Sequence, residues 1–242
     1  MLKWSERDLN LKTKKNKMTN FAKELKEGTK KSHSAAENTK FVSSFLRGVV
    51  SEENYRGLIS NFYFVYRAME EEISKHKSDP TIGQVYYKSL ERTNFLERDL
   101  RYYYGPNWRA IVVPTEACQQ YVNRIREVEP YLLIAHHYTR YIGDLSGGVI
   151  LKGIAEKALT LPEGEGLYFY DFPNIPDAKE FKNSYRKQLD SIPLTEHQKN
   201  AIIVEANYAF RLNMYMFDEL EGDATKSFLQ IILGIIIPKG KR

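Results

Sequence analysis

One histidine of this chain, His33, has an acidic side chain, Glu37, one helical turn after it and a lysine, Lys26, two turns before it. At about 100° per residue, the three side chains share one face of a helix. A carboxylate one turn away orients the second ring nitrogen of a histidine, as is usual for histidines that bind metals. The spacing therefore allows a metal ligand or an exposed ion pair on a charged helix, and taken alone it favours the ion pair.

A helical segment, residues 143–159 (GDLSGGVILKGIAEKAL), begins with three glycines in six residues. Glycine inside a helix costs about 1 kcal/mol relative to alanine, so these glycines need a reason. Gly143, Gly147 and Gly148 stand at positions i, i+4 and i+5 and form one nearly bare stripe. Such a stripe permits the close crossing of a second helix or the close approach of a ligand, and the pattern alone favours the crossing.

Two cationic side chains, Lys182 and Arg186, stand four residues apart in EFKNSYRKQL. On one helix face such a pair is able to hold carboxylates or phosphates. Pairs of this kind are more often solvated, so the pattern alone favours a solvated face.

The other histidines and the single cysteine show no metal-binding spacing such as HExxH or CxxC. His76 and His197 stand among charged residues near predicted helix ends, where solvent is expected. His136 and His137 are adjacent, so we expect one to face the core and the other to face outward. Cys118 has no Cys or His within one helical turn, which predicts a small buried or half-buried side chain rather than a nucleophile or ligand.

Helices must position these side chains, because helical periodicity dominates the sequence and no alternating strand pattern is present. Prolines separate the predicted helices, which cover 52–76, a run from about Pro130 through the glycine stretch, 177–192 and 195–222. In the last of these, Thr195 is the expected N-cap and Gly222 the expected stop. The helix over 52–76 presents one apolar face, made of Tyr55, Leu58, Ile59, Phe62, Val65, Tyr66, Met69 and Ile73. We predict an all-α fold, a single-domain helical bundle.

The charge of the chain is concentrated at its ends. The formal net charge is +5, but residues 1–17 hold six basic and two acidic side chains, and the last four residues add three more basic ones. The rest of the chain is slightly acidic, which argues against a nucleic-acid-binding protein. With 42% hydrophobic and 28% charged residues, the composition is that of a globular protein, and one cysteine fits a reducing compartment.

Three segments are expected along the chain: a disordered basic extension over 1–17, a folded domain over 18–225 and a tail over 226–242. The extension lacks the apolar core of a signal peptide. The apolar part of the tail, 228–237, is ten residues long, whereas a helix that spans a membrane needs about 20. We therefore expect no transmembrane anchor.

Three motifs in this order, LKEGTKKSHSAAEN, LIAHHYTRYIGDLSGG and FKNSYRKQL, resemble those of heme oxygenase. The resemblance covers roughly residues 20–220 and is greatest to the short enzymes of cyanobacteria and algal plastids. It implies a helical bundle in which heme b lies between a proximal and a distal helix. Heme is then both cofactor and substrate, and the products are biliverdin, carbon monoxide and ferrous iron, with cleavage expected at the α-meso carbon.

The resemblance also implies roles for individual residues. His33 falls on the position of the iron ligand, and Glu37 is its orienting partner. The positions that hold the two heme propionates are Lys26, Tyr138, Lys182 and Arg186. The distal helix, over the oxygen-binding face, carries Gly143, Asp144, Gly147 and Gly148. Tyr66 and Arg140 fall in a distal polar network with Asp144, joined to it through an ordered water. Phe210 and Asn213 match positions that line the pocket.

The sequence contains no flavin or nicotinamide motif, so the resemblance implies that a partner supplies electrons. That partner is expected to be ferredoxin, an acidic protein, attracted by a basic rim of Lys30, Lys31, Lys182 and Lys187. A bilin or biliverdin reductase is a further expected partner, and the expected location is the cytoplasm or the plastid stroma.

Two other functions remain open at this point. One is a heme carrier or sensor on the same fold that does not degrade its ligand, and Asp144 with the glycine stripe speaks against it. The other is a non-heme, thiaminase-like hydrolase of the same architecture, which needs a cysteine nucleophile. Cys118 is the only cysteine available and lacks a recognisable base nearby in the sequence.

Overall fold

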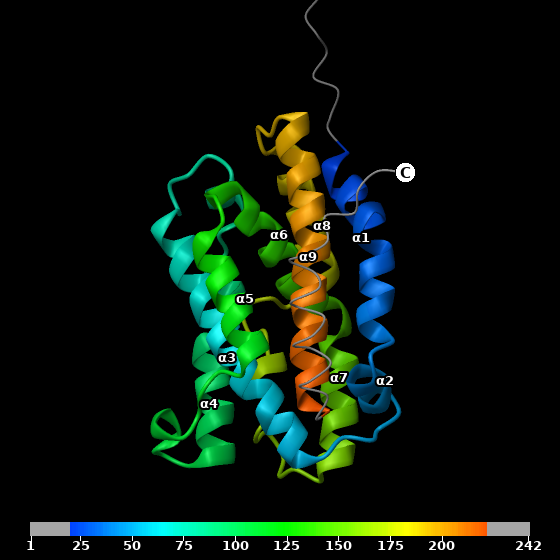
Figure 1. The fold of residues 1–242 in the computed structure, drawn as a ribbon, viewed down its shortest axis with the longest axis vertical. Coiled ribbons are helices and arrows are strands. Elements are labelled where there is room, and N and C mark those ends of the chain that lie inside the picture. Colours follow the sequence, from blue (N-terminus) through cyan, green and yellow to red (C-terminus); the bar gives the residue numbers. More distant parts are fainter. Residues whose placement is uncertain (1–19, 222–242) are drawn as a thin grey trace, which may run out of the picture.

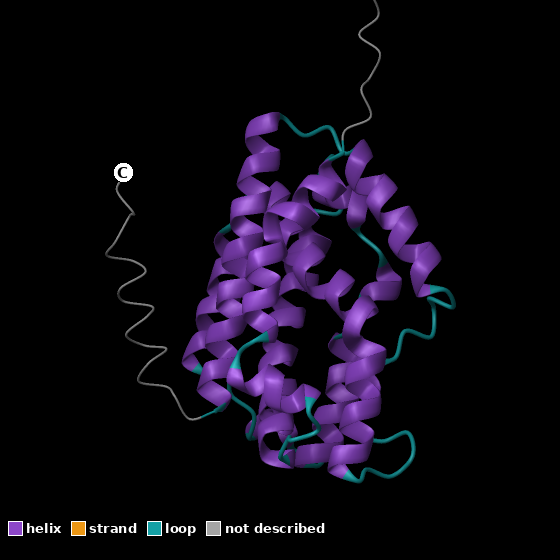
Figure 2. Ribbon diagram, turned by 90° about the vertical axis from the view of Figure 1, so that its right-hand side faces the viewer, coloured by secondary structure: helices purple, strands orange, loops and turns teal. Residues whose placement is uncertain are grey.

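The computed structural model describes residues 20–221, and within that range every regular element is helical (Figures 1 and 2). The α-helices are α1 (Phe21–Glu37), α2 (Lys40–Leu46), α3 (Glu52–Lys75), α4 (Thr93–Tyr104), α5 (Glu116–Glu127), α6 (Leu133–His137), α7 (Gly143–Leu159), α8 (Ala178–Ser191) and α9 (Glu196–Leu220). Shorter helical turns lie between them: η1 (Ile82–Val85), η2 (Lys88–Leu90), η3 (Trp108–Ala110), η4 (Pro130–Leu132), the π-helical turn η5 (Tyr138–Ile142) and η6 (Tyr168–Tyr170). The predicted all-α fold is confirmed.

Local capping explains where the predicted helices begin. The hydroxyl of Thr195 accepts a hydrogen bond from the backbone N–H of Gln198, and the side-chain oxygen of Gln198 accepts one from the backbone N–H of Thr195, which completes a capping box. The side chain of Ser51 caps α3 by accepting from the backbone N–H of Asn54, and Asp177 accepts from two backbone N–H groups of α8. The expected N-cap of α9 is therefore confirmed, whereas its expected stop, Gly222, lies outside the described residues.

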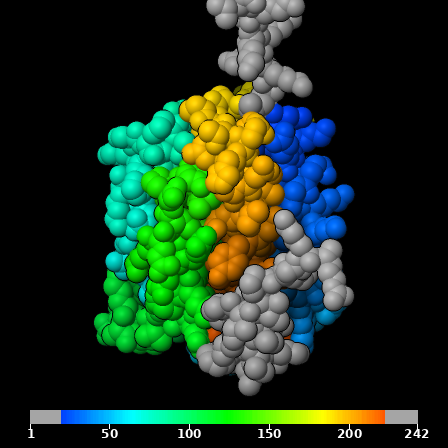
Figure 3. Space-filling view, turned by 45° about the horizontal axis from the view of Figure 1, so that its top comes forward, coloured from blue at the N-terminus to red at the C-terminus, as the bar shows by residue number. Residues whose placement is uncertain are grey.

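Helix α9 is a central element of the bundle, because it packs against α1, α3, α5 and α6. Figure 3 shows it in orange at one face, between α1 in blue and α5 in green. The apolar face predicted for α3 is buried throughout, and it packs against α4 and α5. Burial of these side chains supplies the main favourable term of folding.

The run predicted from Pro130 through the glycines is helical over its whole length, with η4, α6, η5 and α7 in succession. Our expectation for His136 and His137 is wrong, because both are buried, at 0% and 1% exposure. The reason is that α6 has neighbours on more than one side, including α3, α9 and η1. His136 pairs with Glu205 at 3.1 Å, and His137 lies 2.8 Å from the hydroxyl of Tyr185.

Of the other two histidines, His197 is exposed as expected, and His76 is half-buried. The predicted extension over 1–17 and tail over 226–242 fall outside the described residues. Within residues 20–221, none of the helices has the length and apolar character needed to cross a bilayer.

Candidate functional site

Two adjoining cavities, one almost wholly apolar and one with a more polar and charged lining, lie between α1, α7 and α9. One is apolar, with about 830 Å³ of space between protein atoms, its open mouth included. The other has about 1100 Å³ of such space and is lined by three cations, Lys26, Lys30 and Arg186. His33, Thr139, Gly143 and Phe210 line both cavities, so the two form one continuous site.

One wall of this site is α1, which carries His33 at the junction of the cavities. Nδ1 of His33 lies 3.4 Å from Glu37, as the helical spacing predicts. The ring of Phe210, on α9, meets the imidazole edge-on at a centroid distance of 5.7 Å. Within residues 20–221, no hydrogen bond occupies Nε2 of His33. That nitrogen is available to a ligand in the cavity.

The opposite wall is α7, and its glycines have two different environments. A Cβ added at Gly143 or Gly147 meets no other atom within 4 Å, so a closely crossing helix does not explain them. A Cβ added at Gly148 comes within 3.3 Å of the Tyr170 ring. The expected bare stripe of three glycines is thus corrected to two open positions, with Gly148 serving close packing instead.

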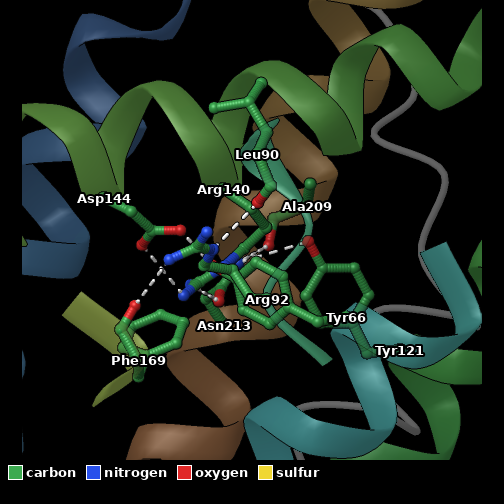
Figure 4. Close-up of polar contacts among 9 residues, drawn as sticks. All are labelled: Tyr66, Leu90, Arg92, Tyr121, Arg140, Asp144, Phe169, Ala209 and Asn213. Atoms are coloured by element: carbon green, nitrogen blue, oxygen red, sulfur yellow. Dashed lines mark hydrogen bonds and ion pairs between the residues drawn. The ribbon is translucent and has the colours of Figure 1, made fainter. Parts of the chain in front are cut away.

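A buried polar network extends from α7 to α3 and α9 (Figure 4). The hydroxyl of Tyr66 donates to Asp144, and Nε of Arg140 donates to Tyr66 at 2.9 Å. The guanidinium of Arg140 lies 3.5 Å from Asp144 and donates to Oδ1 of Asn213 at 2.6 Å. Asp144 thus contacts Tyr66 and Arg140 directly, so the water expected to join these three side chains is not needed for that purpose.

Burial sets the protonation states in this network. It raises the pKa of Asp144, while the charge of Arg140 and the hydrogen bond from Tyr66 act in the opposite direction. Burial also raises the pKa of the Tyr66 hydroxyl well above its usual value, so Tyr66 stays protonated and donates. Burial alone would lower the pKa of Arg140, but Tyr66 and Asp144 hold it above its usual range. Of the three groups, Asp144 is the carboxylic acid, and burial raises its pKa above the usual value of such a group.

The residues predicted to bind carboxylates converge only in part. Lys26, Tyr138 and Arg186 line the basic cavity. Lys182 does not line it; its ammonium group donates to Ser146 at 3.2 Å, and Ser146 does line the cavity. Lys182 and Arg186 are therefore more than a solvated pair, since Arg186 lines the basic cavity and Lys182 binds a residue that lines it.

Several residues of the site carry no signal in the sequence. The hydroxyl of Thr139 is buried at the junction of the cavities and has no partner within the described chain. The π-helical turn η5 contains Thr139, and such turns are frequent at functional sites. Phe169 and Tyr170 complete the apolar wall, from a segment without helical periodicity. Only the turn character of that segment is visible in the sequence.

Cys118 does not behave as a nucleophile. The side chain is fully buried, and its sulfur donates to the backbone oxygen of Asn61 at 3.4 Å. Burial raises the pKa of the thiol, which disfavours the reactive thiolate. The hydrolase alternative therefore has no support in the structure.

Known proteins resemble this chain over most of its length. The family model described as "Heme oxygenase" matches residues 19–219. The heme oxygenase of Porphyra purpurea is 51% identical over 222 residues, which cover 90% of this chain and 94% of that protein. Heme oxygenase 1 of Synechocystis is 52% identical over 211 residues, covering 86% of this chain and 88% of that protein. The crystal structure of Synechocystis heme oxygenase-1 in complex with heme superposes with a TM-score of 0.82 at 49% identity, over 90% of this chain and 100% of that one. On this evidence the chain belongs to the heme oxygenase family.

Proposed function

We propose that this chain binds heme b across the two cavities and, with oxygen and supplied electrons, cleaves it at a meso carbon to biliverdin, carbon monoxide and ferrous iron. The observation that carries the proposal is the pairing of the two walls. His33 stands on one side with a free ring nitrogen, and the Asp144 network stands on the other beside two open glycine positions. A protein that only carries heme needs the iron ligand on the first wall, but it does not need the buried Asp144 network on the second.

The cavities fit the chemistry of heme. The ring is flat and mostly apolar, as is one cavity, and its two propionates match the cations of the other. The missing side chain at Gly143, which lines both cavities, leaves room for a plate close to the backbone of α7. The unpartnered hydroxyl of Thr139 supplies a polar group where the two cavities meet.

Four cavity-facing or nearby groups are assigned to the propionates in this proposal: Lys26, Tyr138, Lys182 and Arg186. His33 is assigned to the iron, with Glu37 fixing its ring orientation through Nδ1. Together they fix the in-plane rotation of the ring and thereby select the carbon that is attacked, α-meso by expectation. Lys182 must release Ser146 to take part.

When bound, heme supplies the iron at which oxygen is reduced. The chain supplies the proton, and Asp144 is assigned to deliver it because burial has raised its pKa. Tyr66 and Arg140 fix the carboxylate in place. Phe210 and Asn213 line the apolar cavity on the α9 side, where Asn213 also orients Arg140.

The proposal includes ferredoxin as the electron donor. It is supported by exposed Lys30, which lines the basic cavity, and by exposed Lys31 and Lys187, which are the chain neighbours of the cavity-lining Lys30 and Arg186. Half-buried Lys182 adds a fourth positive charge. Opposite charge on a small acidic protein would raise the rate of productive encounter. A location in the cytoplasm or plastid stroma is supported by the cyanobacterial and algal relatives.

One spectral experiment tests the function. Purified protein is mixed with hemin and then with reduced ferredoxin or ascorbate in air. Oxygenase activity predicts a Soret band that decays into biliverdin absorbance. A Soret band that persists unchanged would support a carrier, and absence of the band would contradict both heme-binding functions.

A further inference from the structure

A short segment, residues 168–171, forms the cavity wall beside α7 although it has few hydrogen bonds of its own. The turn η6 is closed by two backbone hydrogen bonds, from Tyr170 to Leu167 at 3.2 Å and from Asp171 to Tyr168 at 2.9 Å. Its side chains Phe169 and Tyr170 line the apolar cavity. A turn held so sparsely needs external support if its rings are to stay in place.

The first support is Asp99, a fully buried carboxylate inside α4. One of its oxygens accepts the backbone N–H of Tyr168, and the other accepts that of Phe169, each at 2.8 Å. No salt bridge to Asp99 is present within residues 20–221. Burial raises the pKa of this carboxyl group to about 7. A buried acid of this kind is costly and is retained here by two main-chain donors alone.

The second support is Arg92, at the N-cap position of α4 and 1% exposed. Its guanidinium donates to the backbone oxygens of Phe169, at 3.4 Å, and of Asp171. It also donates to the backbone of Leu90 at 2.9 Å, and the ring of Phe172 stacks on it at 3.8 Å. In the described chain, Arg92 makes no salt bridge with a carboxylate.

Arg92 lies at the N-terminal end of α4, and Asp99 lies seven residues further along the same helix. Both side chains bind the main chain of η6. Asp99 takes the N–H of Phe169, and Arg92 takes its carbonyl oxygen. Phe169 is thus held at both polar groups of its backbone by two buried side chains. Both side chains therefore fix the position of the same residue, Phe169.

The ring of Phe169 transmits that position to the polar network. It packs against Phe62 at a centroid distance of 5.3 Å and against Tyr66 at 5.4 Å. Tyr66 donates to Asp144, and the guanidinium of Arg140 lies over the Phe62 ring at 4.2 Å. Figure 4 shows Arg92 and Phe169 next to Tyr66, Arg140 and Asp144.

We propose that Arg92 and Asp99 are positioning residues of heme cleavage: they clamp the main chain of residues 168–171, so that Phe169 holds Tyr66, and through it Asp144, in place. The inference rests on the proposed function. It assigns a role in the reaction to two residues that do not touch the cavity.

The test compares Asp99→Asn and Arg92→Lys with Arg101→Met and Glu163→Gln, which replace exposed charges on α4 and in the loop before η6. Hydrogen exchange of the Tyr168 and Phe169 amides is measured in the hemin complex at a temperature where circular dichroism shows every variant folded. Loss of one of the paired acceptors in Asp99→Asn should speed exchange by about 10-fold, which corresponds to about 1.4 kcal/mol. The two control variants should exchange at the wild-type rate.

Two functional readouts separate positioning from mere stability. Asp99→Asn and Arg92→Lys should bind hemin with wild-type affinity but give less biliverdin per heme and a changed isomer composition. The absorption spectrum of the hemin complex is also recorded as a function of pH, and the midpoint of its change should shift in both variants. Arg92→Lys keeps the positive charge that acts on Asp144 and Tyr66, so a shift there reports a change of position. Phe169→Leu, which leaves the clamp intact, should reproduce the isomer change with normal amide exchange.

A lower melting temperature with unchanged isomers, yield and spectral midpoint would overturn the positioning role. Wild-type protein that binds hemin but releases no biliverdin would contradict the proposed function alone. In that case the amide exchange and the spectral titration still decide whether the clamp controls the network.

Discussion

Replacement of Gly143 by alanine should stabilise the protein and impair its function at the same time. Gly143 has ordinary helical backbone angles, with φ −62° and ψ −50°, so alanine fits without strain. Its added Cβ meets no protein atom within 4 Å. The gain in helix propensity is therefore expected in full, at about 0.5–1 kcal/mol. For a domain of this size, the melting temperature of the heme-free protein should rise by about 1–4 °C.

The same methyl group projects into space that both cavities share. If heme fills that space, the methyl group overpacks the complex, at a cost of about 1–3 kcal/mol. The dissociation constant for hemin should then rise by about 5- to 150-fold. Thermal unfolding followed by circular dichroism measures the first effect, and titration of the Soret band measures the second.

Gly153 offers a matched control on the same helix. A Cβ added there also meets nothing within 4 Å, but Gly153 lines neither cavity. Gly153→Ala should give the same gain in stability with unchanged hemin affinity. Equal hemin affinity in Gly143→Ala, Gly153→Ala and wild type would refute the claim that the heme ring lies against Gly143.

Three further perturbations test other parts of the site and fold. Replacing Lys182 and Arg186 together by glutamate should weaken hemin binding and broaden the biliverdin isomer composition, measured by chromatography; an unchanged single isomer would mean that they only face solvent. Asp144→Ala should bind hemin almost normally but form little biliverdin, and Asp144→Asn should be impaired to a lesser or similar degree; wild-type turnover in the alanine variant would remove Asp144 from the reaction. Burial opposes ionisation of Glu205, but hydrogen bonds from Arg124 and His136 outweigh it and lower its pKa to about 2. A carboxyl group whose pKa is lowered by folding stabilises the folded state at every pH above its unfolded-state pKa. Glu205→Gln should therefore lower the free energy of unfolding by about 3 kcal/mol at pH 7. Denaturant titration should show the difference in stability between variant and wild type shrinking as the pH falls from about 4.5 to about 2.

The local parts of this structure follow from the sequence. The apolar face of α3 and the pairing of His33 with Glu37 are set by residues three, four and seven apart on one helix. The capping box at Thr195 is likewise a matter of adjacent residues. The functional roles came from resemblance to a family, because the spacing of His33 or of the glycines alone favoured other interpretations.

Features that depend on which elements meet in space were not predictable in this way. His136 and His137 are both buried because α6 is surrounded, and periodicity within one short helix does not reveal that. Gly148 differs in role from Gly143 because it packs against Tyr170, and the segment that contains Tyr170 has no helical periodicity in the sequence. Asp99 resembles any charged residue of a helix until its main-chain partners, 69 and 70 residues away, are known.

The most direct test of the central claim, that heme binds between α1 and α7 with His33 on the iron, is a hemin titration of His33→Ala with and without imidazole. Alanine keeps the helix intact, since it is the better helix former. Wild type should bind one hemin per chain with the spectrum of a histidine-ligated iron and turn it into biliverdin. The variant should lose that spectrum and most of its turnover, and added imidazole should restore both in part. A wild-type spectrum and wild-type turnover in His33→Ala without imidazole would contradict the claim.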